Sequence, residues 1–210
     1  WGLHAQSKWG VQRADYQLVA EDYRGSDWWN GLAWEPWSWV ELSYGWRDRD
    51  RDYDHRLEVT PGGRPIEGTE LSFAQVEEQA EISFQWEKWG RWSLGAGWSA
   101  RENRDEASGF YDYDRSGWNG MIEWRSPQRD WECRVEWEDD DLDYLHQTVG
   151  AGLDPAARAQ RDRWIRVELW RRINSRWEVQ IEFEDLLSES NETDGSYRDQ
   201  IVWVGFTFNS

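Results

Sequence analysis

The sequence has no long hydrophobic run. A membrane-spanning helix needs about 18 or more consecutive apolar residues, whereas the longest strongly apolar run here is Ile201 to Val204. Helical spacing of apolar residues is also scarce, and only residues 154–163 suit a short turn of helix within a loop. A membrane protein built of helices is therefore excluded, and we expect helices to contribute little to the fold.

Cysteine and basic residues are scarce as well. Cys133 is the only cysteine, which excludes an internal disulfide and a cysteine-based zinc cluster. Lys and Arg total 24 against 42 Asp and Glu, and the net charge of −18 argues against a nucleic-acid partner, which would need a basic face. The first residues lack the basic start and apolar segment of a signal peptide, so either that segment has been removed or the chain is not exported.

Aromatic residues, by contrast, are abundant. The chain carries 20 Trp, 8 Tyr and 6 Phe although its mean hydropathy is −1.01. Acidic disordered chains are poor in aromatic residues, so this chain is expected to fold. Its length of 210 residues suits a single domain, 1–210, that is long enough to bury a core. Residues 1–8 are expected to lead into the first strand.

Apolar and polar residues alternate along much of the chain. The alternation is strict from Trp177 to Phe183, from Ile82 to Trp86 and from Val40 to Tyr44, and it recurs from Trp131 to Trp137. Successive side chains of a strand point to opposite faces, so such segments are strands with one apolar and one polar face. The fold is therefore predicted to be all-β.

Short and long connections between the predicted strands alternate along the chain. Short ones fall near 35–38, 87–90, 126–129 and 173–175, and long polar ones near 49–69, 102–116, 139–161 and 186–196, with a shorter one near 21–27. All five prolines lie in these connections, where a missing N–H breaks no ladder. An even number of strands with tight turns on one side is typical of a closed, antiparallel, up-and-down transmembrane barrel. The predicted strands are 9–20, 28–35, 38–48, 70–87, 91–101, 117–125, 130–138, 162–172, 176–185 and 197–208.

Tryptophans flank every tight turn, and a second set lies six residues away along the strands. An even separation keeps both rings on one face. Six residues span roughly 20 Å, which is close to the ~25 Å apolar band between the aromatic girdles of outer-membrane barrels. We therefore predict a membrane-interface girdle of Trp28, Trp34, Trp86, Trp92, Trp98, Trp118, Trp124, Trp131, Trp137, Trp177 and Phe183.

An alternative is a soluble acidic β-barrel or sandwich, a binding protein whose tryptophan face is its core. Cores favour Leu, Ile and Val of varied size, which makes two rows of Trp harder to explain there. One strand departs from the pattern, because Trp164 and Trp170 share parity with Arg166 and Glu168. Either a bulge or inward-facing indoles would account for it.

The end of the chain resembles a known class of protein. The segment Tyr197 to Phe208 is similar to the closing strand of bacterial outer-membrane barrels, which commonly ends in Phe and carries the assembly signal. The segment Phe110 to Arg115 resembles the sequences that precede strands in such barrels. Asn209 and Ser210 follow the final aromatic residue, which departs from the pattern. The resemblance implies a small porin-like barrel of the Gram-negative outer membrane.

The polar face of such a barrel points inward. Acids dominate it, and carboxylates closed off without partners would be costly, so we expect water, cations or a partner's basic segment inside. Small residues at Ser93, Gly95, Gly97 and Ser99 leave room, although ten strands imply a narrow or plugged lumen. The predicted lumen-lining residues are Arg13, Asp15, Glu41, Gln85, Glu87, Glu123, Glu132, Arg134, Glu136, Arg166, Glu168, Glu178, Gln180 and Glu182.

Two functions suit this barrel: a narrow, cation-preferring pore, or a membrane anchor for a larger assembly. The expected partners are the lipid bilayer and either cations or a protein, and no cofactor is expected. The charges on the polar face would alternatively pair with one another and only stabilise the barrel. No metal site is assigned, because Glu138 to Asp143 resembles a cation-binding loop in composition only and lacks the spacing of an EF-hand.

Catalysis is a further alternative, since omptin-like proteases and lipid-modifying enzymes share this architecture. Such enzymes need clustered Asp and His or Ser and His groups near the outer rim. The three histidines, His4, His55 and His146, are scattered in the sequence, and only His146 has acids nearby. We therefore predict that the chain is not an enzyme.

Overall fold

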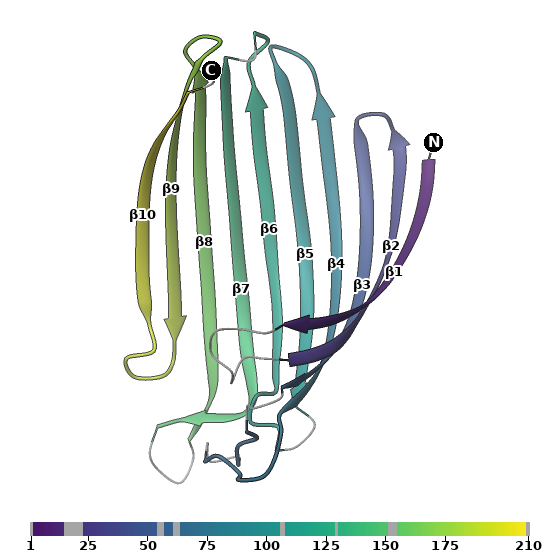
Figure 1. Cartoon of the computed structure of the whole chain (residues 1–210), viewed down its shortest axis with the longest axis vertical. Helices are drawn as coiled ribbons and strands as arrows, with labels where there is room; N and C mark the ends of the chain where they lie inside the picture. The colour runs from purple at the N-terminus through teal and green to yellow at the C-terminus, as the bar shows by residue number, and fades with distance from the viewer. Residues whose placement is uncertain are drawn as a thin grey trace.

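The computed structural model describes residues 2–14, 23–53, 57–60, 64–105, 108–128, 130–150 and 155–208. Within them, ten antiparallel strands form one curved sheet whose spatial order follows the sequence order (Figure 1). The predicted all-β, up-and-down arrangement of ten strands is thus confirmed. The strands are β1 (Gly2–Ala14), β2 (Tyr23–Trp37), β3 (Val40–Tyr53), β4 (Ser72–Trp86), β5 (Arg91–Asp105), β6 (Tyr113–Arg125), β7 (Trp131–Val149), β8 (Ala156–Arg172), β9 (Trp177–Ser190) and β10 (Tyr197–Phe208).

The tight turns lie at one end of the sheet, where Figure 1 also shows both chain termini. The longer connections lie at the other end, which we call the loop end. No helix that is long and apolar enough to cross a membrane occurs in the described part of the chain.

The strands run further toward the loop end than predicted. Residues 139–149 and 156–161, expected in a loop, belong to β7 and β8, so the helical turn proposed for 154–163 is wrong over 156–163. The acidic segment Glu138 to Asp143 is likewise part of β7 and not a loop. Charge pairing explains the extension, because Arg161 on β8 donates two hydrogen bonds, of 2.7 and 2.6 Å, to Asp139 on β7.

The first strand begins earlier than predicted. Residues 2–8 are not a lead-in but pair with β2 in an uninterrupted register in which Trp9 faces Trp28. The segment was missed because Ser7 interrupts the apolar face formed by Leu3, Ala5 and Trp9. Residues 15–20 of the predicted strand lie outside the described residues.

The register divides the side chains between two faces. Residues paired across neighbouring strands point to the same side of a sheet. We call one side the tryptophan face, since it carries the paired Trp86, Trp92 and Trp124. We call the other the charged face, which carries Gln85 and Glu123.

An apolar band of nearly constant width follows the tryptophan face from the tight-turn end. On β7 the four positions of this face from Trp131 to Trp137 are apolar, and the next is Asp139. On β9 the four positions from Trp177 to Phe183 are apolar, and the next is Asp185. β3 and β10 keep the same width. Each band spans six residues, or about 20 Å along the strand.

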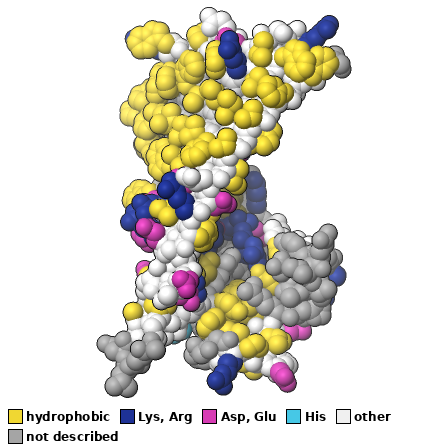
Figure 2. Space-filling view, turned by 90° about the vertical axis from the view of Figure 1, so that its left-hand side faces the viewer, with side chains coloured by type: hydrophobic (Ala, Val, Ile, Leu, Met, Phe, Trp, Pro, Cys, Tyr) yellow, Lys and Arg dark blue, Asp and Glu magenta, His cyan; other side chains and the backbone are white. Residues whose placement is uncertain are grey.

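No second layer covers this band among the described residues. Trp118 and Phe206 are 66% and 70% exposed, and the only buried hydrophobic side chains described are those of Val40, Val59, Leu71 and Phe73. Figure 2 shows hydrophobic side chains gathered over the upper half of the molecule, with charged side chains below them. The tryptophan face is therefore not a core formed within the chain.

The sheet begins with β1 and ends with β10, and no pairing joins these two strands among the described residues. Both strands are exposed along most of their length, as the side chains of Val11 (70%) and Val202 (69%) illustrate. The two outer edges of the sheet thus present their backbone hydrogen-bonding groups without a partner strand.

Candidate functional site: the charged face

Most residues predicted to line the polar side do share one face. The members that the pairing places on the charged face are Glu41, Gln85, Glu123, Glu132, Arg134, Glu136, Arg166, Glu168, Glu178, Gln180 and Glu182. Glu87 lies just beyond β4, where it lines a cavity of about 470 Å³ at the tight-turn end together with Arg125 and Glu132.

The structure corrects the prediction that Arg13 lies on the polar face. This residue pairs with Arg24 and lies on the tryptophan face, two residues from Val11 and four from Trp9. The prediction was wrong because the tryptophan face itself becomes polar beyond the apolar band, so a polar residue there does not identify the charged face. Asp15 lies outside the described residues.

All the predicted girdle tryptophans, and Phe183, lie on the tryptophan face. Two further rings join the row nearest the loop end: Trp9, paired with Trp28, and Trp46 on β3. They were missed because their partners six residues away are Leu3 and Val40 and not aromatic.

Trp164 and Trp170 lie on the charged face together with Arg166 and Glu168. Two explanations were considered for this placement, a bulge in the strand or indoles that point to the polar side, and the second is correct. The β8–β9 register runs without a bulge, so the indoles simply point that way. The Trp164 indole N–H donates a hydrogen bond of 3.3 Å to the Glu184 carboxylate. An indole that reaches a carboxylate has the polar partner that a buried Trp needs.

Acids and arginines lie next to one another on the charged face of β6 to β9. We call this part of the charged face the acidic wall. Arg166 lies 2.9 Å from both Glu168 and Glu182. Arg125 lies 3.0 Å from Glu123 and 2.9 Å from Glu132. Each of these two arginines forms ion pairs with two carboxylates. The net charge of the acidic wall is therefore negative although many of its charges are paired.

Small residues line the charged face on β3 and β5. Gly45 on β3 and Gly95, Gly97 and Ser99 on β5 all point to this side, as the sequence suggested for β5. The Trp29 indole lies over Gly31, in the place that a side chain there would fill. Gly45, Gly95, Gly97 and Ser99 therefore add little side-chain volume to the charged face, whereas the Trp29 ring fills the space over Gly31.

A second cluster of charge lies near the loop end of β1 to β5, and we call it the basic patch. It consists of Lys8, Arg47, Arg49, Arg51 and Arg101, with Asp27 and Glu77 as its acids. The Arg47 Nε–H donates a 2.8 Å hydrogen bond to Asp27, and this contact holds the pKa of that carboxyl below its usual range.

The basic patch is the part of the site that was missed. The segment Arg47 to Asp54 alternates in sign, and its strand geometry sends Arg47, Arg49 and Arg51 to the charged face and Asp48, Asp50 and Asp52 to the other. The same alternation that defines the apolar band thus segregates charge beyond it.

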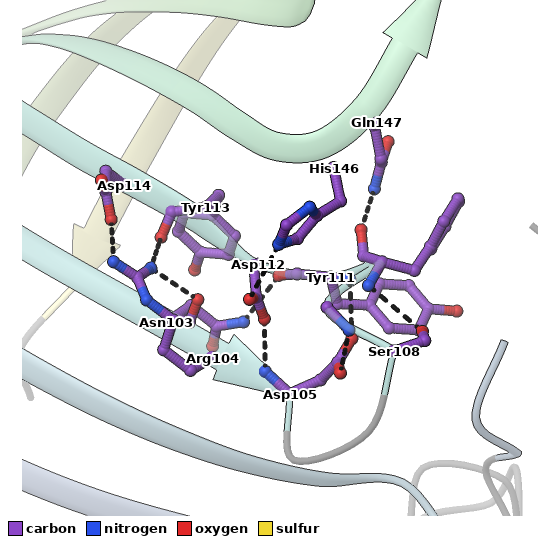
Figure 3. A network of polar contacts seen from close by, with 12 residues as sticks. Asn103, Arg104, Asp105, Ser108, Tyr111, Asp112, Tyr113, Asp114, His146 and Gln147 are labelled. Carbon is purple, nitrogen blue, oxygen red and sulfur yellow. Dashed lines mark hydrogen bonds and ion pairs between the residues drawn. The ribbon is translucent and has the colours of Figure 1, made fainter. Parts of the chain in front are cut away.

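Polar contacts at the loop end form the network of Figure 3, which joins the turn between β5 and β6 to β7. The Asp105 carboxylate accepts hydrogen bonds from the backbone N–H groups of Gly109 (2.6 Å) and Tyr111 (2.9 Å). The Asp112 carboxylate accepts one of 2.7 Å from the Asp105 N–H and lies 3.7 Å from His146 Nε2. These acids are occupied by backbone, which fits a structural role better than a catalytic one.

Of the other histidines, His4 lies on β1, and His55 is outside the described residues. In the described part of the chain, no group of three or more His, Cys, Asp or Glu side chains is placed to hold a metal ion.

A scan against protein families and a search of curated proteins find no match to the chain.

Proposed function

We propose that the chain is an outer-membrane β-barrel whose tryptophan face contacts lipid and whose charged face lines a narrow, cation-preferring pore. The observation that carries the proposal is the uncovered apolar band of constant width. Exposing Trp118, Trp28 (52%) and Trp177 (45%) to water would be unfavourable. In a bilayer the band meets hydrocarbon, and its two rows of Trp lie at the interfaces.

The proposal requires β1 to pair with β10 and close the sheet. An unpaired strand edge is costly in lipid because no water satisfies its backbone groups. Several features support closure: the two strands have 13 and 12 residues, and an even strand number makes them antiparallel. The β10 positions Val202, Val204 and Phe206 continue the band of β9, and Trp9 and Val11 lie on the same face of β1.

The negative balance of the acidic wall supports cation preference. On closing, the acidic wall of β6 to β9 would face β1 to β4, with Gly45 on β3, across the lumen, leaving a passage bounded mainly by carboxylates on the side of the wall. Carboxylates raise the local concentration of cations and lower the barrier to their passage. The arginines of the acidic wall are shared between acids and do not reverse its sign.

Two measurements test the proposal. Detergent-purified protein should migrate differently on a semi-native gel before and after heating, because a closed barrel resists detergent until heated. In planar bilayers it should conduct with a cation-to-anion permeability ratio above one, and Glu178→Gln should lower that ratio. Chain that is folded and monodisperse in plain buffer would contradict the membrane placement. Folded protein in the bilayer that shows no conductance, or anion preference, would contradict the pore.

A further inference from the structure

The basic patch contains more guanidinium groups than its own acids engage. Arg47, Arg49 and Arg51 alternate along the charged face of β3, so neighbouring Cα atoms are about 6.6 Å apart. Like charges at this spacing repel one another, especially where water is partly excluded. Burial and the neighbouring arginines accordingly lower the pKa of Arg49. Such an arrangement is costly unless a negative group offsets it.

The carboxylates nearby are already engaged. Asp27 accepts hydrogen bonds from Arg47 and from the Gln12 side-chain amide, and its nearest approach to Arg49 is 3.9 Å. Glu77 lies 3.1 Å from Arg101. Arg51 forms no ion pair with a described residue, and its guanidinium lies 4.8 Å from the centre of the Tyr23 ring. The Nε atoms of Arg49 and Arg51 are both buried without a hydrogen-bond partner.

The neighbouring strand positions supply no acid for Arg51. Its partner on β2 is Gly25, where a Cβ atom would collide with the Asp50 carbonyl oxygen, so no acidic side chain fits there. Its partner on β4 is Phe73, and the partner of Arg49 on β4 is Gln75. Among the described residues, the strand partners of Arg51 are thus neutral, whereas Arg49 has Asp27 as its partner on β2.

We propose that Arg49 and Arg51 form a binding site for an oxyanion, a carboxylate or phosphate group, on the charged face near the loop end. A guanidinium group presents a planar fork of N–H donors that matches two oxygens of such a group. The Tyr23 and Tyr53 rings, 5.6 Å apart, border the site beside Arg51 and suit a ligand that carries its anion on a ring or carbon skeleton. The site goes beyond the proposed pore, because binding does not require conduction.

The test is isothermal titration calorimetry of detergent-folded protein at low salt, with citrate and inorganic phosphate as separate probes. Saturable binding of either probe is expected, and the probe that binds more tightly identifies the source of the oxyanion. Arg49→Gln with Arg51→Gln should weaken binding at least about tenfold, since a charge-assisted hydrogen bond is lost at each position. Arg49→Lys with Arg51→Lys keeps the charge but loses the fork, and its affinity should fall between the two.

The control is Arg163→Gln. Arg163 is an arginine of β8 that lies on the tryptophan face and forms an ion pair with Glu189 there. The affinity of this variant for the probe should therefore stay within twofold of that of the parent protein. Gel mobility before and after heating confirms that each variant is folded, and Arg51→Gln alone replaces the double variant if that does not fold. Equal affinity in the parent and the glutamine variant, or no saturable binding by the folded parent, would overturn the site. Binding without conductance would retain the site and reject the pore.

Discussion

The Trp137 indole on β7 lies directly over Gly120 on β6, in the space that a side chain at Gly120 would occupy. Both residues lie on the tryptophan face within the apolar band, whose edge nearest the loop end is marked on β7 by Trp137. The ring thus covers backbone that glycine leaves open, and it can lie flat only because Gly120 has no Cβ. This contact gives a sharp test of how the band is packed.

Gly120→Val should destabilise the fold by about 1–3 kcal/mol, because the added side chain and the Trp137 ring require the same space. The matched control is Gly10→Val on β1, where a Cβ would meet nothing within 4 Å. Denaturant unfolding in detergent, followed by tryptophan fluorescence, measures both variants. If the two substitutions prove equally costly, the loss of glycine itself and not the ring contact is responsible.

Ile122 and Met121 are consecutive residues of β6 that point to opposite faces. Ile122→Arg should destabilise the membrane-inserted protein by about 2–4 kcal/mol, since Ile122 lies near the middle of the apolar band. Met121→Arg should cost much less, because a polar, hydrated side accepts the charge. Reversible unfolding in lipid vesicles compares them, and a greater loss for Met121→Arg would reverse the assignment of the faces.

Closure of the sheet is tested by engineered disulfides in a Cys133→Ser background, which removes the single native cysteine. Val11→Cys should cross-link on oxidation with either Val202→Cys or Val204→Cys, because these positions share the tryptophan face. It should not cross-link with Trp203→Cys, which points to the other face. A disulfide requires Cβ atoms about 3.5–4.5 Å apart, so the bond reports direct strand pairing. Absence of a bond in all three pairs speaks against β1–β10 closure.

The Asp139–Arg161 pair, beyond the apolar band, makes loop-end stability depend on pH. The Arg161 guanidinium donates two hydrogen bonds that lower the pKa of Asp139 from 3.8. Because the folded pKa is lowered, the pair stabilises the fold above the unfolded pKa and stops doing so as pH falls through the lower, folded value. Amide protection at this end of β7 and β8 should stay constant from pH 7 to about 5 and fall, by at most about fivefold, below about pH 4.

Asp139→Asn should abolish most of that pH dependence. Asp143→Asn, on the same strand and face, is the control and should preserve it. Hydrogen exchange corrected for intrinsic rates gives the protection factors. An unchanged acid response in Asp139→Asn would assign the effect to other carboxylates.

The side on which a residue lies could be predicted wherever apolar and polar positions alternate strictly. This explains why the tryptophan rows and the acidic wall were assigned correctly. The alternation signal is weak at the start of β1, where Ser7 interrupts the apolar face, and fails at the loop ends, where both faces are polar. Arg13 was misplaced, and the Arg49–Arg51 cluster missed, for this second reason: polarity marks a face only within the apolar band. Pairing of specific charges depends on register, which a single strand's sequence does not contain.

The strict order of the sheet also has a kinetic consequence. Every pairing described joins strands that are consecutive in the sequence, so each hairpin closes only the connection between two neighbouring strands, and the entropic cost of closure grows slowly with the length of that connection. Folding can then proceed from neighbour to neighbour with low contact order. The proposed joining of β1 to β10 would be the exception, because it would bring together residues from opposite ends of the chain. We therefore expect the proposed β1–β10 pairing to form last and to be the slow step, after the other strands have assembled.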